Sequence, residues 1–498
     1  MKIKLECVSV ENCKCDTLIV NEFEGVKHPG GATGAVDKAL GGEISKLLAS
    51  GAINGKLGST YPIQTYGKIK ADEVICVGLG KSADFNLDKV RIVSDAAIKA
   101  AKRCRARRVA TIIHGAGIGG LDPKLAAQAV AEGSMLGDYK FKGFKTEVEN
   151  NEPVIDELVI VDHDPEKIRS IEPSIELAQI LVDSTNRARD LVNSPSNKNT
   201  PTYLAEYASS MAKEMKMECQ VLGRDEIIKK GMDALYSVSR GSKEEPKVIV
   251  LKYKGGTGDT YGLIGKGITF DSGGISLKPS SKLSEMKTDM AGAAIVIEVM
   301  RTVAKLKLKV NIIAVIPMTE NMPGGNAYKP GDVIGSLSGK TIEVINTDAE
   351  GRLILADAIS YAKELGAIKL IDIATLTGGV KVALGDVAAG LMGNNDELAG
   401  KLLKSSEATG EKLWRLPLYE EYKEYLKSDI ADIQNTSESG GKASASVGGT
   451  FLQKFVGDMP FAHIDIGGTA YIEKEQAYLT TGATGYGVRL LVNFFNNL

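Results

Sequence analysis

Acidic and basic side chains alternate in one short stretch of the 498-residue chain, NTDAEGRL, which contains Asp348, Glu350 and Arg352. The residue pattern predicts a β-strand at 341–345 before this stretch and an apolar helix at 353–359 after it. In extended backbone, residues two positions apart point to the same side. We therefore expect two carboxylates and one guanidinium to converge at the carboxyl end of a strand, either as an ordinary helix start or as part of a reaction centre.

Two other stretches place ionisable residues at the ends of expected elements. GKGITFDSGGISLKP contains Lys266, Asp271 and Lys278 around the end of an apolar strand, and SEMKTDMAGAA contains Asp289 at the head of a helix pattern over 284–306. Each residue alone has an ordinary explanation, because acids cap helices, Asp before Ser-Gly-Gly forms turns and lysines lie on surfaces. Together, four carboxylates at adjoining strand ends cannot all ionise at close range without a compensating cation.

A divalent metal would supply that charge. Oxygen-rich ligation suits Mg²⁺, Mn²⁺ or, less typically, Zn²⁺, and two metals about 3.5 Å apart activate water and polarise a carbonyl or phosphoryl group. The four histidines are scattered and form no His-Glu-x-x-His pair, so a histidine-based zinc site is poorly supported. From the residues alone, a metal or anion site and purely structural roles for these acids both remain open.

Composition argues against several classes of protein. The 43% hydrophobic and 25% charged residues are those of an ordinary globular protein. With 61 basic and 63 acidic side chains and a net charge of −2, no bulk attraction favours nucleic acid or an anionic membrane. Six mostly scattered cysteines predict no disulfide framework, and we find neither a signal peptide pattern nor a segment able to span a bilayer. We expect a cytoplasmic protein without membrane contact.

The length predicts at least two domains. We expect a small α/β domain at 1–170, a connecting helix within 171–195 and a larger α/β domain at 196–498 with a central sheet buried on both faces. The strands expected in the small domain are 16–20, 73–78, 108–114 and 156–162, and its helices are 34–50, 86–103 and 123–138. The strands expected in the larger domain are 247–252, 261–268, 310–317, 368–374 and 463–466.

The three charged stretches closely resemble the signature blocks of the M17 leucyl aminopeptidase (cytosol aminopeptidase) family. Their spacing matches as well, with 5 residues from Lys266 to Asp271, 18 more to Asp289 and 59 more to Asp348. The resemblance is strong over 175–498 and loose before it. It implies a macro-like N-terminal α/β domain, a C-terminal catalytic α/β domain and a homohexamer built as a dimer of trimers.

The resemblance also implies two divalent metal ions per subunit, Mn²⁺ or Zn²⁺ before Mg²⁺ or Co²⁺. One would bind Asp271, Asp348 and Glu350, and the other would bind Lys266, Asp271, Asp289 and Glu350. These ions would hold the free amino group of a peptide and polarise its first peptide bond, which a bridging water attacks. As a ligand, the lysine must be neutral, which requires a strongly depressed pKa.

Further roles follow from the same resemblance. Lys278 would stabilise the oxyanion, and Arg352 would hold a bicarbonate ion that serves as general base. Met286, Thr375 and Gly378 match the family's substrate-pocket positions and imply a preference for N-terminal leucine and other apolar residues. Plain core packing is the alternative role of the methionine.

Three features lie outside the resemblance or depart from it. The segment 429–446 diverges from the family pattern, which puts product-side specificity and subunit contacts in doubt, and Phe461 stands where the family commonly has tryptophan. The stretch HPGGATGAVDKALGG at 28–42 suggests either a nucleotide-phosphate loop or a tight turn and helix start. Two rival functions are a two-metal phosphohydrolase and a DNA-binding accessory role, and the near-neutral charge argues against the second.

Overall fold

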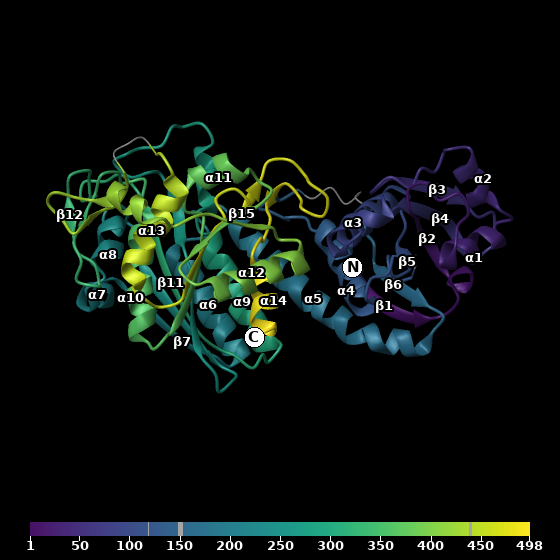
Figure 1. The fold of residues 1–498 in the computed structure, drawn as a ribbon, viewed down its shortest axis with the longest axis horizontal. Helices are drawn as coiled ribbons and strands as arrows, with labels where there is room; N and C mark the ends of the chain where they lie inside the picture. Colours follow the sequence, from purple (N-terminus) through teal and green to yellow (C-terminus); the bar gives the residue numbers. More distant parts are fainter. Residues whose placement is uncertain (118, 148–152, 438–440) are drawn as a thin grey trace. The chain divides into compact units, whose positions relative to one another are not determined.

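The computed structural model divides the chain into two compact units, each with its own central β-sheet (Figure 1). The first unit comprises Met1–Asp183 and Lys474–Thr481, and the second comprises Ser184–Glu473 and Gly482–Leu498. The structure describes residues 1–117, 119–147, 153–437 and 441–498. The expected two-domain α/β architecture is confirmed. Among the described helices, none combines the length and apolar character needed to cross a membrane.

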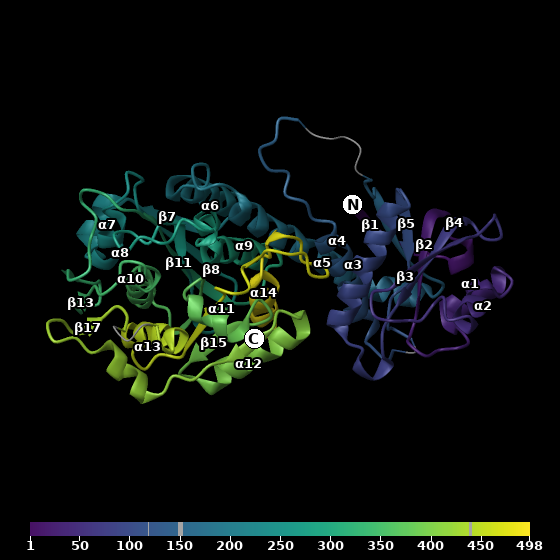
Figure 2. The ribbon, with the colours of Figure 1, turned by 90° about the horizontal axis from the view of Figure 1, so that it is seen from above.

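The first unit is a six-stranded sheet with the order β1-β6-β5-β2-β4-β3, in which β3 alone pairs antiparallel. Helices α3 and α4 cover one face of the sheet and share an apolar core with it. Helices α1 and α2 cover the other face and share a second apolar core with it (Figure 2). The strands are β1 Lys2–Cys7, β2 Cys15–Glu22, β3 Thr60–Gln64, β4 Ala71–Gly78, β5 Arg108–Thr111 and β6 Glu157–Asp162. The helices are α1 Gly31–Ala39, α2 Glu43–Ala49, α3 Leu87–Arg103, α4 Pro123–Gly137 and α5 Pro165–Asn193, which continues into the second unit.

Local sequence explains where these helices begin and end. The side chain of Asn86 accepts a hydrogen bond from the amide of Lys89 and caps α3, and Asp122 caps α4 in the same way. The single helix expected at 34–50 is wrong, because the chain forms two helices separated by Gly41 and Gly42. Both glycines have positive φ, +76° and +83°, which ends α1 and turns the chain into α2.

The second unit has a nine-stranded mixed sheet whose order is β16-β15-β18-β14-β9-β11-β8-β7, with β10 paired to the end of β11. Helices α8, α10 and α13 lie on one side of β11, and α6, α9 and α14 lie on the other (Figure 1). The strands are therefore buried on both faces, as their apolar sequences predict. The sheet strands are β7 Glu218–Leu222, β8 Lys247–Lys254, β9 Thr260–Gly265, β10 Gly267–Asp271, β11 Asn311–Asn321, β14 Lys369–Ala374, β15 Ala389–Gly393, β16 Leu413–Arg415 and β18 Phe461–Asp465.

Helices and short strands complete the second unit. The helices are α6 Pro201–Met215, α7 Arg224–Lys230, α8 Asp233–Ser239, α9 Ala291–Lys305, α10 Gly351–Glu364, α11 Gly378–Leu384, α12 Asp396–Thr409, α13 Ser444–Val456 and α14 Val488–Asn496. Two small sheets lie beside the main one and consist of β12 Val333–Ile334, β13 Ile342–Glu343 and β17 Ile433–Gln434, and of β19 Tyr471–Ile472 and β20 Gly482–Ala483. The expected strand at 341–345 is thus only two residues long.

The apolar run expected as one strand at 261–268 is two strands, and the break falls at Lys266. β9 pairs in parallel with β11 and β14, and β10 continues beside the end of β11. Glycines flank the break at Gly265 and Gly267, where a side chain would collide with the neighbouring backbone or with Met318. The break places Lys266 at the carboxyl edge of the sheet.

Close packing of α9 against this edge depends on Gly292, and this predicts a stability effect. A Cβ at Gly292 would collide with the carbonyl oxygen of Ile373 and lie 2.8 Å from the amide nitrogen of Lys266. We expect Gly292→Ala to lower the free energy of unfolding by about 1–3 kcal/mol, because the helix must move away from the sheet. Gly400→Ala in α12 is the matched control, since its Cβ meets nothing within 4 Å, and it should stabilise by about 0.5–1 kcal/mol. Equal thermal unfolding midpoints of the two variants would contradict the prediction.

Candidate metal centre

The charged residues of the three sequence stretches meet at the carboxyl edge of the second unit's sheet. Lys266 lies between β9 and β10, and Asp271 is the last residue of β10. Asp289 follows a 3₁₀ helix at Leu283–Thr288 and precedes α9. The helix expected over 284–306 therefore begins later than predicted, at Ala291. Functional residues commonly gather at this edge in α/β folds.

The stretch that contains Asp348 and Glu350 is a turn followed by a helix, so the expected extended backbone is wrong. The side chain of Asn346 accepts a hydrogen bond from the Asp348 amide at 2.8 Å, which folds the chain into a turn. Glu350 has φ −76° and ψ −35° as the N-cap residue of α10, and Arg352 lies in the first turn of that helix. The turn and the helix start, rather than strand alternation, bring the two acids together.

Asp271, Asp348 and Glu350 form a cluster in which one carboxylate oxygen from each residue lies within 4.8 Å of the others. Asp271 and Glu350 are almost fully buried, and the Asp348 side chain retains 32% exposure. Burial raises the pKa of Asp348 to about 6, and it also raises the pKa of Asp271. Ionising all three acids together therefore requires positive charge at this position.

Lys266 supplies part of that charge. Its ammonium lies 2.8 Å from Asp289 Oδ2 and 3.0 Å from Glu350 Oε1, and it donates to the carbonyl oxygen of Thr375 at 2.9 Å. Burial alone would lower its pKa, but the attraction of Asp289, Glu350 and Asp271 outweighs burial and raises it. Lys266 is therefore an ammonium ion here, and it would have to lose its proton to bind a metal.

Lys278 bridges the other side of the cluster. Its ammonium lies 2.9 Å from Asp271 Oδ2 and 2.5 Å from Asp348 Oδ1. These acids raise its pKa against the opposing effect of burial, so it too is charged. Burial raises the pKa of Asp289 to about 8, whereas Lys266 and Lys278 overcome burial and lower the pKa of Glu350. The two ammonium groups thus favour the ionised form of Glu350.

Arg352 is 5% exposed, and its Nη1 donates to the carbonyl oxygen of Asn435 at 2.9 Å. Its Nε is buried and has no hydrogen-bond partner among the described residues. Burial lowers the pKa of this guanidinium to about 10, so it remains a cation at neutral pH. A buried cation with an unused donor suits an anionic ligand.

The three expected substrate-pocket residues lie on three different segments of the second unit. Thr375 directly follows β14, and its hydroxyl donates to Asp289 Oδ1 at 2.7 Å. Met286 lies half-buried in the 3₁₀ helix, three residues before Asp289. Gly378 is exposed at the first position of α11. Hydrogen bonding thus joins Thr375 to Asp289, which is an ion-pair partner of Lys266.

Two asparagines that the sequence did not single out hold the site together. Asn321, at the end of β11, donates to Asp271 Oδ1 at 2.8 Å and to the carbonyl oxygen of Thr347 at 3.0 Å. Asn435 accepts from the amide of Ile345 at 2.8 Å and donates to the carbonyl oxygen of Asn346 at 2.7 Å. A polar residue ending an apolar strand was a usable signal for Asn321, and for Asn435 the signal was its place in the divergent segment 429–446.

Asn435 belongs to the divergent segment 429–446, so this segment supports the turn that carries Asp348. Residues 438–440 of the segment lie outside the described part of the chain. Phe461, the other departure, is the fully buried first residue of β18 and belongs to the apolar core. Its replacement of tryptophan therefore affects packing.

The residues present fit a divalent metal. Glu350 Oε2 is buried without a hydrogen-bond partner among the described residues, which is unusual for a carboxylate and leaves a lone pair free for an ion. The donors are carboxylates with one amine, a set that suits hard or borderline cations. Divalent ions held by such a site could activate water and polarise a carbonyl or phosphoryl group.

Comparison with known families shows which family the chain belongs to. The model of the cytosol aminopeptidase family's catalytic domain matches residues 186–492, and that of the family's N-terminal domain matches residues 19–148. The chain belongs to this family of metal-dependent aminopeptidases, as the sequence resemblance predicts.

Similarity to individual proteins extends over almost the full length of the chain. The chain is 43% identical to a probable cytosol aminopeptidase of Geobacter sulfurreducens, covering 99% of each sequence, and 40% identical to that of Alkaliphilus oremlandii, covering 100% of each. Two solved structures of a bottromycin maturation enzyme, BotP, are 31% identical and cover 97% of this chain and 99% of theirs. Their TM-scores are 0.84 and, for the complex with Mn, 0.85.

Proposed function

We propose that the chain is a leucyl aminopeptidase that releases N-terminal leucine and other apolar residues from peptides at a dinuclear metal centre. The observation that carries the proposal is the cluster of Asp271, Asp348 and Glu350, in which a buried Glu350 oxygen lacks a partner among the described residues. Membership of the cytosol aminopeptidase family supports the substrate class.

The ligand assignment is as follows. Asp271, Asp348 and Glu350 would hold one ion, and Lys266, Asp271, Asp289 and Glu350 would hold the other. Mn²⁺ or Zn²⁺ is favoured over Mg²⁺ or Co²⁺, and the Mn complex of a similar structure supports the first of these. When bound, the pair of ions supplies Lewis acidity toward the peptide carbonyl and lowers the pKa of water between them.

The remaining chemistry belongs to the chain's own cations. Lys278 has an ammonium at the cluster and 22% exposure of its side chain, so it can reach a bound carbonyl oxygen and stabilise the negative charge that develops there. Arg352 would hold a bicarbonate ion as general base, and its buried, unused Nε supports the binding of an anion by this residue.

Specificity follows from three residues that match the family's substrate-pocket positions. Met286, Thr375 and Gly378 form the first side-chain pocket, and the flexible thioether of methionine suits leucine as well as other apolar side chains. A free amino terminus would be required because the metal centre would hold the substrate's amine. We further assign the chain to a homohexamer, a dimer of trimers, in the cytoplasm, and the names of the cytosol aminopeptidase relatives support that location.

Hydrolysis of leucine p-nitroanilide tests this function. Protein stripped with a chelator should be inactive and should recover with Mn²⁺ or Zn²⁺, whereas N-acetyl-leucine p-nitroanilide should not be hydrolysed under any condition. Activity without metal, or equal turnover of the acetylated substrate, would contradict the proposal. Metal-dependent turnover of p-nitrophenyl phosphate in place of the anilide would identify a phosphohydrolase instead.

A further inference from the structure

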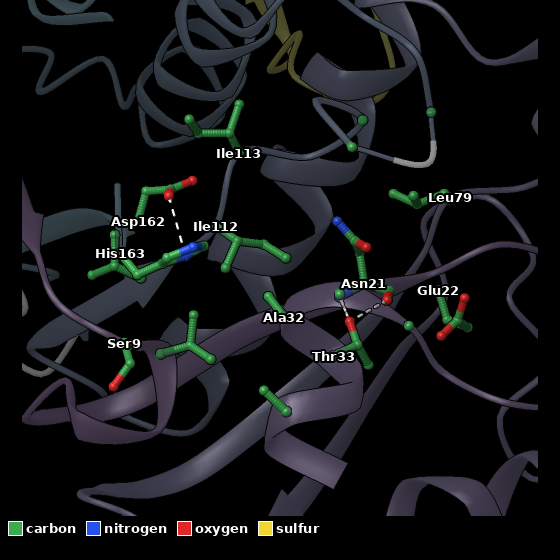
Figure 3. Close-up of a pocket in the computed structure, with 18 of the residues that line it drawn as sticks. Ser9, Asn21, Glu22, Ala32, Thr33, Leu79, Ile112, Ile113, Asp162 and His163 are labelled. Carbon is green, nitrogen blue, oxygen red and sulfur yellow. Dashed lines mark hydrogen bonds and ion pairs between the residues drawn. The ribbon is translucent and has the colours of Figure 1, made fainter. Parts of the chain in front are cut away.

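A cavity of about 540 Å³ lies in the first unit, separate from the residues proposed for aminopeptidase activity. Residues at or just beyond the carboxyl ends of β2, β5 and β6 line it, together with the start of α1 (Figure 3). In Figure 3, Asn21 and Glu22 lie on one side of the view, and Asp162 and His163 lie on the other. This volume is within the range of small-molecule sites, roughly 300–1,000 Å³.

One part of the cavity wall offers backbone donors. α1 is nine residues long, begins at Gly31 after the N-cap residue Gly30, and has no side-chain cap. Among the described residues, no acceptor is bonded to the amides of its first turn. Gly115 and Gly117 on a second loop line the same cavity, and a Cβ at Gly31 or Gly117 would meet nothing within 4 Å. Uncapped helix amides beside exposed glycine backbone bind anions, phosphate above all.

Glu22 is an independent sign of a ligand in the same cavity. Glu22 is 5% exposed, and among the described residues its Oε1 accepts only the amide of the adjacent Phe23, at 3.2 Å. Its Oε2 is buried with no hydrogen-bond partner among the described residues. Burial raises the pKa of this carboxyl to about 7, a cost that an N–H donor on a ligand would offset.

Between these polar features the wall is apolar. Val10, Phe23, Ile112 and Val161 line the cavity and provide surface for a flat ring. A ligand that fits must combine an anion, an apolar or heterocyclic body and an N–H donor. We propose that this cavity binds a nucleoside phosphate, whose phosphate accepts hydrogen bonds from the first turn of α1 and whose amino-bearing base donates to Glu22.

This assignment brings together the two explanations that the sequence left open for 28–42. The stretch is a turn and helix start, as α1 shows, and the uncapped start is the feature that a phosphate requires. Because every residue used here belongs to the first unit, the inference does not depend on the proposed peptidase chemistry.

Calorimetric titration of the full-length protein with AMP, ADP, adenosine and inorganic phosphate tests the proposal. AMP or ADP should bind more tightly than adenosine or phosphate alone. Glu22→Gln, which keeps the shape of the side chain, should weaken AMP binding at least about tenfold and leave phosphate binding unchanged. Ala32→Asp adds a carboxylate that a helix start tolerates, and it should weaken both AMP and phosphate by repulsion.

Ala83→Asp is the matched control, because Ala83 is exposed, lies in the same unit and does not line the cavity. It should bind AMP as the unaltered chain does, and all three variants should retain hydrolysis of leucine p-nitroanilide. The proposal is overturned if neither AMP nor ADP binds, or if their binding is unaffected by both Glu22→Gln and Ala32→Asp. Phosphate binding as tight as that of AMP would also overturn it, since the nucleoside would then contribute nothing.

Discussion

Replacing Glu350 by glutamine is expected to reduce kcat/KM on leucine p-nitroanilide by about 10³-fold or more. The substitution preserves the volume of a buried side chain but removes a negative charge at the centre of the cluster, where Oε2 has no other partner in the described structure. Stabilisation by a correctly placed metal is worth several kcal/mol, and each 1.36 kcal/mol is tenfold in rate. Metal affinity, measured by titration of the stripped protein, should fall with the rate.

Glu298→Gln is the matched control for this loss. Glu298 is equally buried in the same unit, but it accepts hydrogen bonds from Tyr207 and Arg301 and does not belong to the acidic cluster. Its replacement should leave metal affinity and kcat/KM within a few-fold of the unaltered chain, although it should cost some stability by weakening the contact with Arg301. If both variants lost activity equally, burial of a charge in general, and not its position at the cluster, would explain the effect.

The sequence was sufficient to predict that the charged residues meet, because apolar runs mark buried strands and polar residues at their ends share one edge. It was insufficient for the local geometry that brings them together. Alternation suggested extended backbone at Asp348, yet the side chain of Asn346 competes for the backbone and forms a turn. The break at Lys266 was hidden within one apolar run because neighbouring strands, not local propensity, decide where β9 ends.

Contacts between residues far apart in the chain were the hardest part of the site to predict from the sequence. Asn435 secures the turn before Asp348 from almost ninety residues further along the chain, and only the folded structure brings β13 and β17 together so that it can do so. The ion pairs of Lys266 are similar, since Asp289 and Glu350 approach it from two separate helix starts. A ligand role for this lysine followed from family resemblance, whereas its role as an internal counterion emerged from the geometry.

Lys266→Met is expected to destabilise the metal-free protein more than it destabilises the metal-loaded protein. Without the ammonium, Asp289 and Glu350 would face one another in a buried site, and removing one partner of a buried ion pair costs about 3–5 kcal/mol. For a unit of this size, that loss corresponds to a fall of roughly 5–8 °C in the midpoint of thermal unfolding. Saturating Mn²⁺ should narrow the difference, because the ions replace the missing positive charge.

Lys278→Met tests whether the destabilisation is specific to Lys266 or follows the loss of either lysine beside the acids. Lys278 also contacts two acids, but its side chain is 22% exposed against 3% for Lys266, so solvent can screen the acids that it leaves behind. We expect a smaller fall in the metal-free midpoint and a larger fall in kcat, since Lys278 is the residue assigned to the oxyanion. Equal metal-free midpoints for the two variants would show that Lys266 is not the counterion of the buried acids. A difference from the unaltered chain that persists at saturating Mn²⁺ would show that the amine is needed as a ligand even when the charge is restored.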